Sequence, residues 1–214
     1  MAKDRTKHST LAQGENLVRL GALIVGESAR TIEVDASKLP APPTSYDADF
    51  AWVEHSIGRV SFFFGKGRRG NTTLRSRVEV KYPVEDLVRR FWKNAQEFRK
   101  TLADYCERWP KDPARDGLRP ESMVAEKEHS EWANVDYMAH AGSEAAIDFY
   151  HVPPGGVARF AKGLGYSALD LSPVLRIQLS SFELRRLLDQ VESIVAEAAK
   201  YVPATETDEA ESQR

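Results

Sequence analysis

The chain of 214 residues lacks several features that mark whole classes of protein. It contains one cysteine, Cys106, which excludes a disulfide framework and a cysteine-based zinc site. No apolar run approaches the ~20 residues that cross a bilayer. The charged start at residues 1–5 leads into no signal-peptide core. We therefore expect a cytoplasmic protein of the bacterial or general cytosolic class, with no membrane association.

The composition is that of a globular chain. Hydrophobic residues make up 42% and charged residues 29% of the sequence, a balance that argues against intrinsic disorder. The length suits one larger domain or two small ones, since domains usually hold roughly 100–200 residues. Residues 1–16 are polar and are predicted to be disordered, and residues 203–214 are predicted to form an acidic disordered tail.

A pattern of three strands followed by one helix occurs twice along the chain. The strand-like segments, in chain order, are 51–56, 59–64 and 77–82, then 133–140, 145–150 and 175–179. Helical patterns follow from Val84 and from Ser181. The two halves are offset by 85 residues at His55 and His140 and by 97 residues at Val78 and Leu175. The difference indicates a loop insertion within 152–170, a segment rich in proline and glycine.

Hydrophobic periodicity sets the type of each segment. Val78, Val80 and Tyr82 alternate with charged residues, which is typical of a strand with one buried face. Apolar residues recur every three to four positions after Val84 and after Ser181, which predicts two amphipathic helices. Ser180 and Glu183 have the spacing of a capping box at the start of the second helix.

These patterns predict an α+β protein. Its tandem duplicated β-β-β-α units are expected to form one antiparallel sheet, with two helices packed on one face. The first unit, with an N-terminal extension that adds an edge strand or two, covers residues 17–108. The second unit covers residues 132–202, and the proline-containing segment 109–131 is predicted to be the linker between them.

Several residues of the second half form a recognisable motif within about residues 132–200. They are Ala133-Asn134, His140, Glu144, Asp148-Phe149, Pro154-Gly155, Arg176-Ile177, Leu179-Ser180 and Leu187-Leu188. This half resembles a family of short bacterial domains of unknown function, and the first half resembles a degenerate copy that keeps His55. The resemblance implies the strand-strand-strand-helix fold. It implies no activity, because the family has no assigned chemistry.

The sequence contains no assembled catalytic set. Residues 65–70 have the spacing G-x-G-x-x-G, but a strand rather than a helix is expected after them, so a flexible basic turn is favoured over a nucleotide site. No G-x-S-x-G elbow is present. Cys106 is interpreted as a half-buried structural thiol rather than a nucleophile. Glu144 and Asp148 lie on one strand, about 13 Å apart, which is too far for a carboxylate pair acting alone.

The histidines give no metal site by their spacing. His129 lies among glutamates, but the H-E-x-x-H pattern is absent, and a solvated charged segment is the favoured interpretation. His55 and His140 occupy equivalent strand ends, where they either form a proton-sensitive pair or, as we expect, hydrogen-bond a turn. We predict no catalytic residue, metal or cofactor, and no enzyme activity.

Charge is distributed unevenly. Residues 58–100 contain twelve Lys and Arg residues against four acids, which makes this segment +8 and the rest of the chain −10. Strand parity directs several of these cations, together with one aromatic ring, to the outer face of the first unit. Such a face is typical of single-stranded nucleic-acid binding. The candidate residues are Arg59, Lys66, Arg68, Arg69, Arg75, Arg77, Lys81 and Phe63.

Two functions remain open at this point. The favoured one is a non-enzymatic protein-interaction or adaptor module that binds a peptide, client or partner protein through a sheet face or a free edge strand. The alternative is binding of single-stranded DNA or RNA through the basic outer face. The expected partner is therefore another protein, with nucleic acid as the second class. Cationic strands also protect sheet edges, and a homodimer covers such an edge as well.

Overall fold

Two four-stranded sheets and two long helices dominate the computed structural model, which describes residues 17–25, 28–35, 39–67, 74–108, 124–153 and 171–200. The strands are β1 (Leu17–Val25), β2 (Ser28–Asp35), β3 (Ser45–Asp47), β4 (Phe50–Ser56), β5 (Arg59–Lys66), β6 (Ser76–Pro83), β7 (Glu128–Trp132), β8 (Val135–Ala141), β9 (Glu144–His151) and β10 (Ser172–Ser180). The helical segments are α1 (Val84–Asp86), η2 (Leu87–Phe91), α2 (Trp92–Arg108) and α5 (Ser181–Ala198). The protein is thus of the mixed α+β class.

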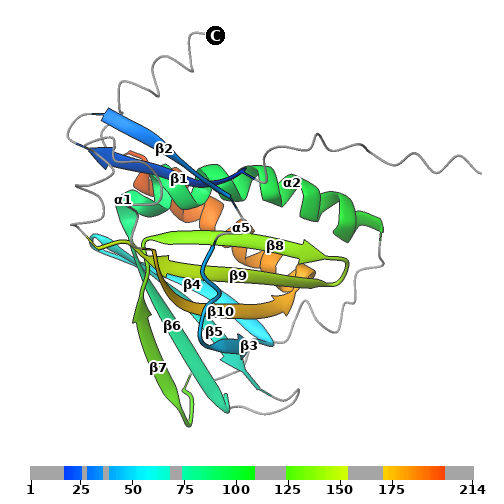
Figure 1. Ribbon diagram of the computed structural model, residues 1–214. Helices are drawn as coiled ribbons and strands as arrows, with labels where there is room; N and C mark the ends of the chain where they lie inside the picture. Colours follow the sequence, from blue (N-terminus) through cyan, green and yellow to red (C-terminus); the bar gives the residue numbers. More distant parts are fainter. Residues whose placement is uncertain are drawn as a thin grey trace, which may run out of the picture.

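The four-stranded sheets share one design. The first, called here the β6 sheet, has the order β4-β5-β6-β7, and the second, the β10 sheet, has the order β3-β10-β9-β8 (Figure 1). In each sheet three strands are antiparallel and consecutive in the chain, and the fourth is parallel to its neighbour. β1 and β2 pair with each other in a separate antiparallel hairpin.

The prediction of one antiparallel sheet is therefore wrong. The parallel strands come from segments that carry no strand signal in the sequence. β7 lies largely within the segment 109–131 expected to be a linker, and its sequence Glu-His-Ser-Glu-Trp has no apolar alternation because most of it is exposed. β3 is only three residues long. Alternation indicates which face of a strand is buried, but it does not indicate which strand lies beside it.

One hydrophobic core joins both sheets and both helices. Phe62 and Phe64 of β5 face Phe149 of β9, with ring centroids 6.1 and 5.9 Å apart, so the inner faces of the two sheets pack against each other. Phe91 of η2 is fully buried against Phe62. The inward positions expected from alternation are confirmed: the buried strand residues include Val78, Val80, Tyr82, Leu175, Ile177 and Leu179.

The helices begin where the sequence predicts and lie against each other. Pro83 is the N-cap of α1, which continues through a turn of π-helix into α2. Ser180 caps α5, since its hydroxyl accepts the Glu183 backbone N–H at 3.1 Å. Arg99 of α2 donates to Asp189 of α5 at 2.8 Å, which fixes the two helices side by side (Figure 1). Within the described ranges, no helix is long and apolar enough to cross a membrane.

The same hydrogen bonds recur at the entry to each hairpin. Three hydrogen bonds of the first half each have a counterpart in the second half, and the donor residues of the two bonds are 85 positions apart in the sequence. In the first pair, Ala48 N donates to Gln178 O at 2.8 Å and Ala133 N donates to Lys81 O at 3.0 Å. In the second pair, Asp49 N donates to Gly65 O at 2.9 Å and Asn134 N donates to Tyr150 O at 3.0 Å. In the third pair, Gly67 N donates to Asp49 Oδ2 at 3.1 Å and Val152 N donates to Asn134 Oδ1 at 2.8 Å. β4 and β8 therefore start with matching backbone geometry.

Candidate functional site

The outer face of the β6 sheet holds four of the eight residues predicted to bind nucleic acid, namely Arg59, Phe63, Arg77 and Lys81. Phe63 points outward as expected, but it is only 8% exposed. Its ring stacks on Trp52 with centroids 5.2 Å apart, and the Arg77 guanidinium lies 5.2 Å from its centroid. A base therefore has no open Phe63 ring on which to stack in this arrangement.

Several of the predicted cations have acidic partners, two of them on the outer face of the β6 sheet and one, the partner of Lys66, on β3 of the other sheet. Arg77 donates to Glu128 of β7 at 2.7 Å, Lys81 lies 3.6 Å from Glu79, and Lys66 lies 3.2 Å from Asp47. Of the other candidates, Arg59 is half-buried, Arg75 is exposed, and Arg68 and Arg69 lie outside the described residues. The sequence did not reveal this neutralisation, because Glu128 was assigned to the linker.

Glu79 is the centre of a polar cluster on this face. Ser61 and Ser130 donate their hydroxyls to its carboxylate at 2.8 and 3.0 Å. Partial burial by itself would raise the pKa of Glu79, but the two hydroxyls and the nearby cations Lys81 and Arg59 outweigh it and hold the pKa below its ordinary value. The face is thus a network of paired charges around an ionised glutamate.

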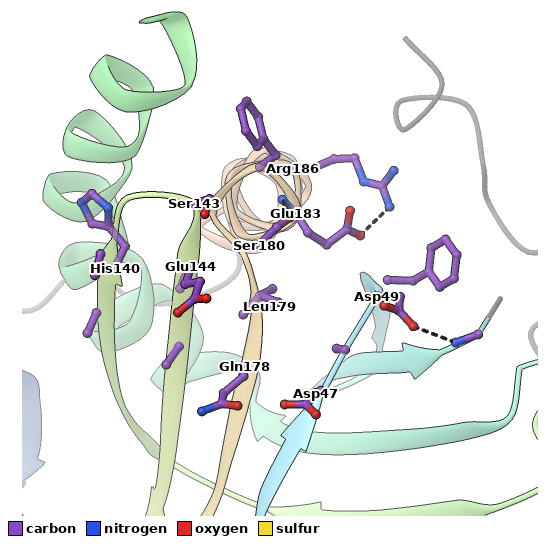
Figure 2. A pocket seen from close by; sticks show the side chains of 18 residues that line it. Asp47, Asp49, His140, Ser143, Glu144, Gln178, Leu179, Ser180, Glu183 and Arg186 are labelled. Atoms are coloured by element: carbon purple, nitrogen blue, oxygen red, sulfur yellow. Dashed lines mark hydrogen bonds and ion pairs between the residues drawn. The ribbon is translucent and has the colours of Figure 1, made fainter. Parts of the chain in front are cut away.

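The β10 sheet has a hollow outer face, in contrast. A groove with a volume of about 770 Å³ crosses it beside the start of α5 (Figure 2). Its floor includes one row of register neighbours across all four strands, namely Ala139, Ala146, Gln178 and Asp47. The small side chains of Ala139 and Ala146 leave the groove open. On the outer face of the β6 sheet, by contrast, the rings of Trp52 and Phe63 fill the surface.

The groove is acidic, with aromatic sides. Four carboxylates and one arginine line it, together with His140 and the rings of Phe50 and Phe182. The carboxylates are Asp47, Asp49, Glu144 and Glu183. The Glu183 carboxylate accepts two hydrogen bonds, one from the Ala51 backbone N–H at 2.7 Å and one from the Arg186 guanidinium at 2.6 Å. Glu144 of β9 and Asp47 of β3 lie on the two strands that flank β10, on either side of Gln178 (Figure 2).

An ion pair supports the sheet next to the groove. Arg176 of β10 donates to both oxygens of the buried Asp148 on β9, at 2.6 Å each. Tyr150 is also held there, and burial together with the Asp148 charge raises the pKa of its hydroxyl. Because Asp148 has an arginine partner, it is a structural carboxylate in this arrangement.

The residues most suited to catalysis are not brought together. His140 pairs in register with Ala145, three residues from Asp148, so the two side chains leave opposite faces of the sheet. His140 instead packs against Phe98 and Tyr105 of α2, whereas His55 is exposed on β4. Burial raises the pKa of the half-buried Cys106 thiol, which disfavours the thiolate.

In the part of the chain that the structure describes, no group of three His, Cys, Asp or Glu side chains is placed to hold a metal ion. His129 contacts only Glu131 among such residues, with 2.7 Å between Nε2 and Oε1.

Comparison with protein-family models, curated proteins and solved structures finds no match. The function is therefore argued from the two sheet faces themselves.

Proposed function

We propose that this protein is a non-enzymatic interaction module that binds an extended, basic segment of a partner protein in the groove of the β10 sheet. The observation that carries the proposal is the acidic groove of about 770 Å³ across four strands. This volume is in the range of specific binding sites, roughly 300–1,000 Å³.

The shape of the groove favours an extended segment. Four strands at ~4.8 Å spacing make a floor about 14 Å wide, which about four extended residues span. Ala139 and Ala146 leave room for apolar side chains of the segment, and Phe50 lines the groove as an apolar wall. The lining carries a formal charge of −3, from four carboxylates and one arginine, so lysine or arginine side chains complement it.

The test is fluorescence anisotropy with two labelled peptides of about eight residues, which share apolar positions and carry either Lys and Arg or Glu and Asp. The basic peptide should bind, more weakly at high salt, and the acidic peptide should not. Ala146→Arg fills the floor and adds a positive charge, so it should weaken binding roughly tenfold or more. Ser56→Arg adds the same charge to an exposed end of β4 and should leave binding unchanged.

Equal binding of both peptides, or an equal effect of the two arginine substitutions, would contradict a role for the groove. Single-stranded nucleic-acid binding is the alternative, supported by the exposed cation Arg75, whose backbone N–H bonds the Lys66 carbonyl at the end of the β5–β6 hairpin. Labelled oligo-dT and oligo-U of about 20 nucleotides distinguish it. Binding that falls steeply with salt and is lost in Arg75→Glu, without peptide binding, would replace the first proposal by the second.

The arrangement behind the groove also supports a proposal about its origin. We infer that the chain is two copies of one unit, each a leading strand, three antiparallel strands and a helix, and that the copies exchange their leading strands, β3 and β7. The recurring hydrogen bonds at Ala48 and Ala133, and at Asp49 and Asn134, support this inference. The groove then occupies the outer face of the second copy, where small residues replaced the aromatic pair of the first.

A further inference from the structure

β7 is an exposed edge strand of unusual composition. Within the described ranges, β6 is its only strand neighbour, and its register with β6 has no bulge. Edge strands are commonly protected by charged side chains, especially lysine, by proline or by a bulge; β7 has two glutamates but no lysine, proline or bulge. The opposite edge of the same sheet is covered, because Glu183 and Gln190 of α5 accept the Ala51 and Val53 backbone N–H groups.

The free hydrogen-bonding groups of β7 follow from its ladder with β6. Arg77 N donates to Lys127 O at 2.8 Å, and Ala133 N donates to Lys81 O at 3.0 Å. In a parallel ladder, the residues that bond the neighbour alternate with residues that point away from it. The backbone N–H and C=O groups of Glu128, Ser130 and Trp132 therefore point away from β6, toward the open edge.

We propose that β7 pairs antiparallel with β7 of a second copy, about a twofold axis at Ser130. Ser130 then lies opposite itself, and Glu128 lies opposite Trp132 of the second copy. All of these residues have outward-pointing backbone groups, which is the condition for hydrogen-bonded antiparallel pairs. The side chain of His129, which is 64% exposed, lies opposite Glu131 of the second copy, an opposite-charge cross-strand pair that occurs twice.

The charges select this register over its neighbours. An axis at Glu131 places two carboxylates directly opposite each other, and an axis at His129 does the same with two imidazoles, both of which are unfavourable pairings when the groups are charged. The axis at Ser130 places no two like charges directly opposite each other, and all five residues of β7 take part in the pairing. The same pairing covers part of Trp132, a residue that is 52% exposed. The proposal is independent of the groove, which lies on the other sheet.

The experiment measures the mass of the full chain by sedimentation equilibrium over a range of concentrations. The wild type should form a concentration-dependent dimer. Ser130→Pro removes an N–H that points away from β6, so it should preserve the fold and abolish the dimer. Ser130→Ala is the matched control, because it removes only the side-chain bond to Glu79 and should leave the dimer intact. A wild type that stays monomeric, or a dimer retained in Ser130→Pro, would overturn the proposal.

A charge exchange keeps the test decisive if Ser130→Pro does not fold. Glu131→Lys places a lysine opposite His129, so it removes the opposite-charge pair and should weaken the dimer roughly tenfold. The double substitution His129→Glu with Glu131→Lys restores opposite charges and should recover it. In a Cys106→Ala background, Ser130→Cys should form an intermolecular disulfide, since paired residues lie ~5.5 Å apart between Cα atoms. Ser56→Cys at the far edge should not, and equal cross-linking of both would reject the register.

Discussion

Individual side chains on the β6 sheet owe their state to residues distant in the sequence. Glu79 receives one hydroxyl from Ser61 on β5 and another from Ser130 on β7, and it lies beside Lys81. These contacts favour the carboxylate over the protonated acid. The residue thereby links β5, β6 and the edge strand β7 through one negative charge.

Because its pKa is lowered on folding, Glu79 stabilises the protein at pH values above its unfolded pKa, and this contribution disappears as the pH falls through the lower folded value. Glu79→Gln should therefore unfold at lower urea concentration than the wild type at neutral pH. The difference should shrink below the ordinary glutamate pKa of 4.5. Urea titrations at neutral and acidic pH measure it.

Ser61→Ala should reproduce part of this pH dependence, since it removes one donor and keeps the carboxylate. A difference between wild type and Glu79→Gln that is the same at neutral and acidic pH would contradict the assignment, because it would then arise from packing rather than from the charge.

At the scale of elements, α5 supplies the hydrogen-bond acceptors that a neighbouring strand would otherwise offer to the edge of β4. Its Glu183 accepts the Ala51 N–H at 2.7 Å, and its Gln190 lies 3.4 Å from the Val53 nitrogen, so the open edge of β4 is satisfied by a helix. The Ser180 cap explains the position of Glu183 in the first turn. The Glu183 carboxylate at this position accepts the Ala51 N–H of β4.

Glu183→Ala leaves the Ala51 N–H without this acceptor and should reduce the free energy of unfolding by about 1–3 kcal/mol. Glu183→Gln keeps an acceptor oxygen and should cost less. Urea denaturation of both variants provides the measurement. If glutamine costs as much as alanine, the ion pair with Arg186 rather than the edge contact is the stabilising interaction.

At the scale of the molecule, β3 and β7 tie the halves of the chain together. β3 extends the β10 sheet, and β7 extends the β6 sheet. Tyr46 of β3 donates to the Ser76 carbonyl at 2.8 Å, and Tyr82 donates to Asp136 at 3.1 Å, so hydroxyls also connect the two sheets. Each sheet contains a strand from the other half of the chain.

Separated halves should therefore not fold alone. We expect residues 1–116 and 117–214, expressed apart, to lack a cooperative thermal transition, because each has lost a strand and half of a shared core. Mixing the halves should restore the transition, and the intact chain should unfold in one step. Circular dichroism follows both. A cooperative transition in either half alone would show that the core is divisible.

The sequence predicted which face of each strand is buried better than it predicted which strands pair with each other. Val78, Val80 and Tyr82 are buried as alternation requires, and both helical runs, the one that opens with α1 and the one that forms α5, begin at the expected residues. The groove could not be predicted, because Ala139, Ala146 and Asp47 become neighbours only through pairing between distant strands. The charge of the β6 sheet was predicted from its own strands, without the carboxylate that β7 adds at Glu128.

The sequence by itself determined the mixed α+β class, which faces of the strands are buried and where the helical runs start, since hydrophobic periodicity and capping act over a few residues. Only the tertiary structure decided that two sheets form instead of one, which edges are open, and which charges are paired. Those outcomes depend on contacts between residues far apart in the chain, and β3 and β7 carry no local signal of the sheets they join.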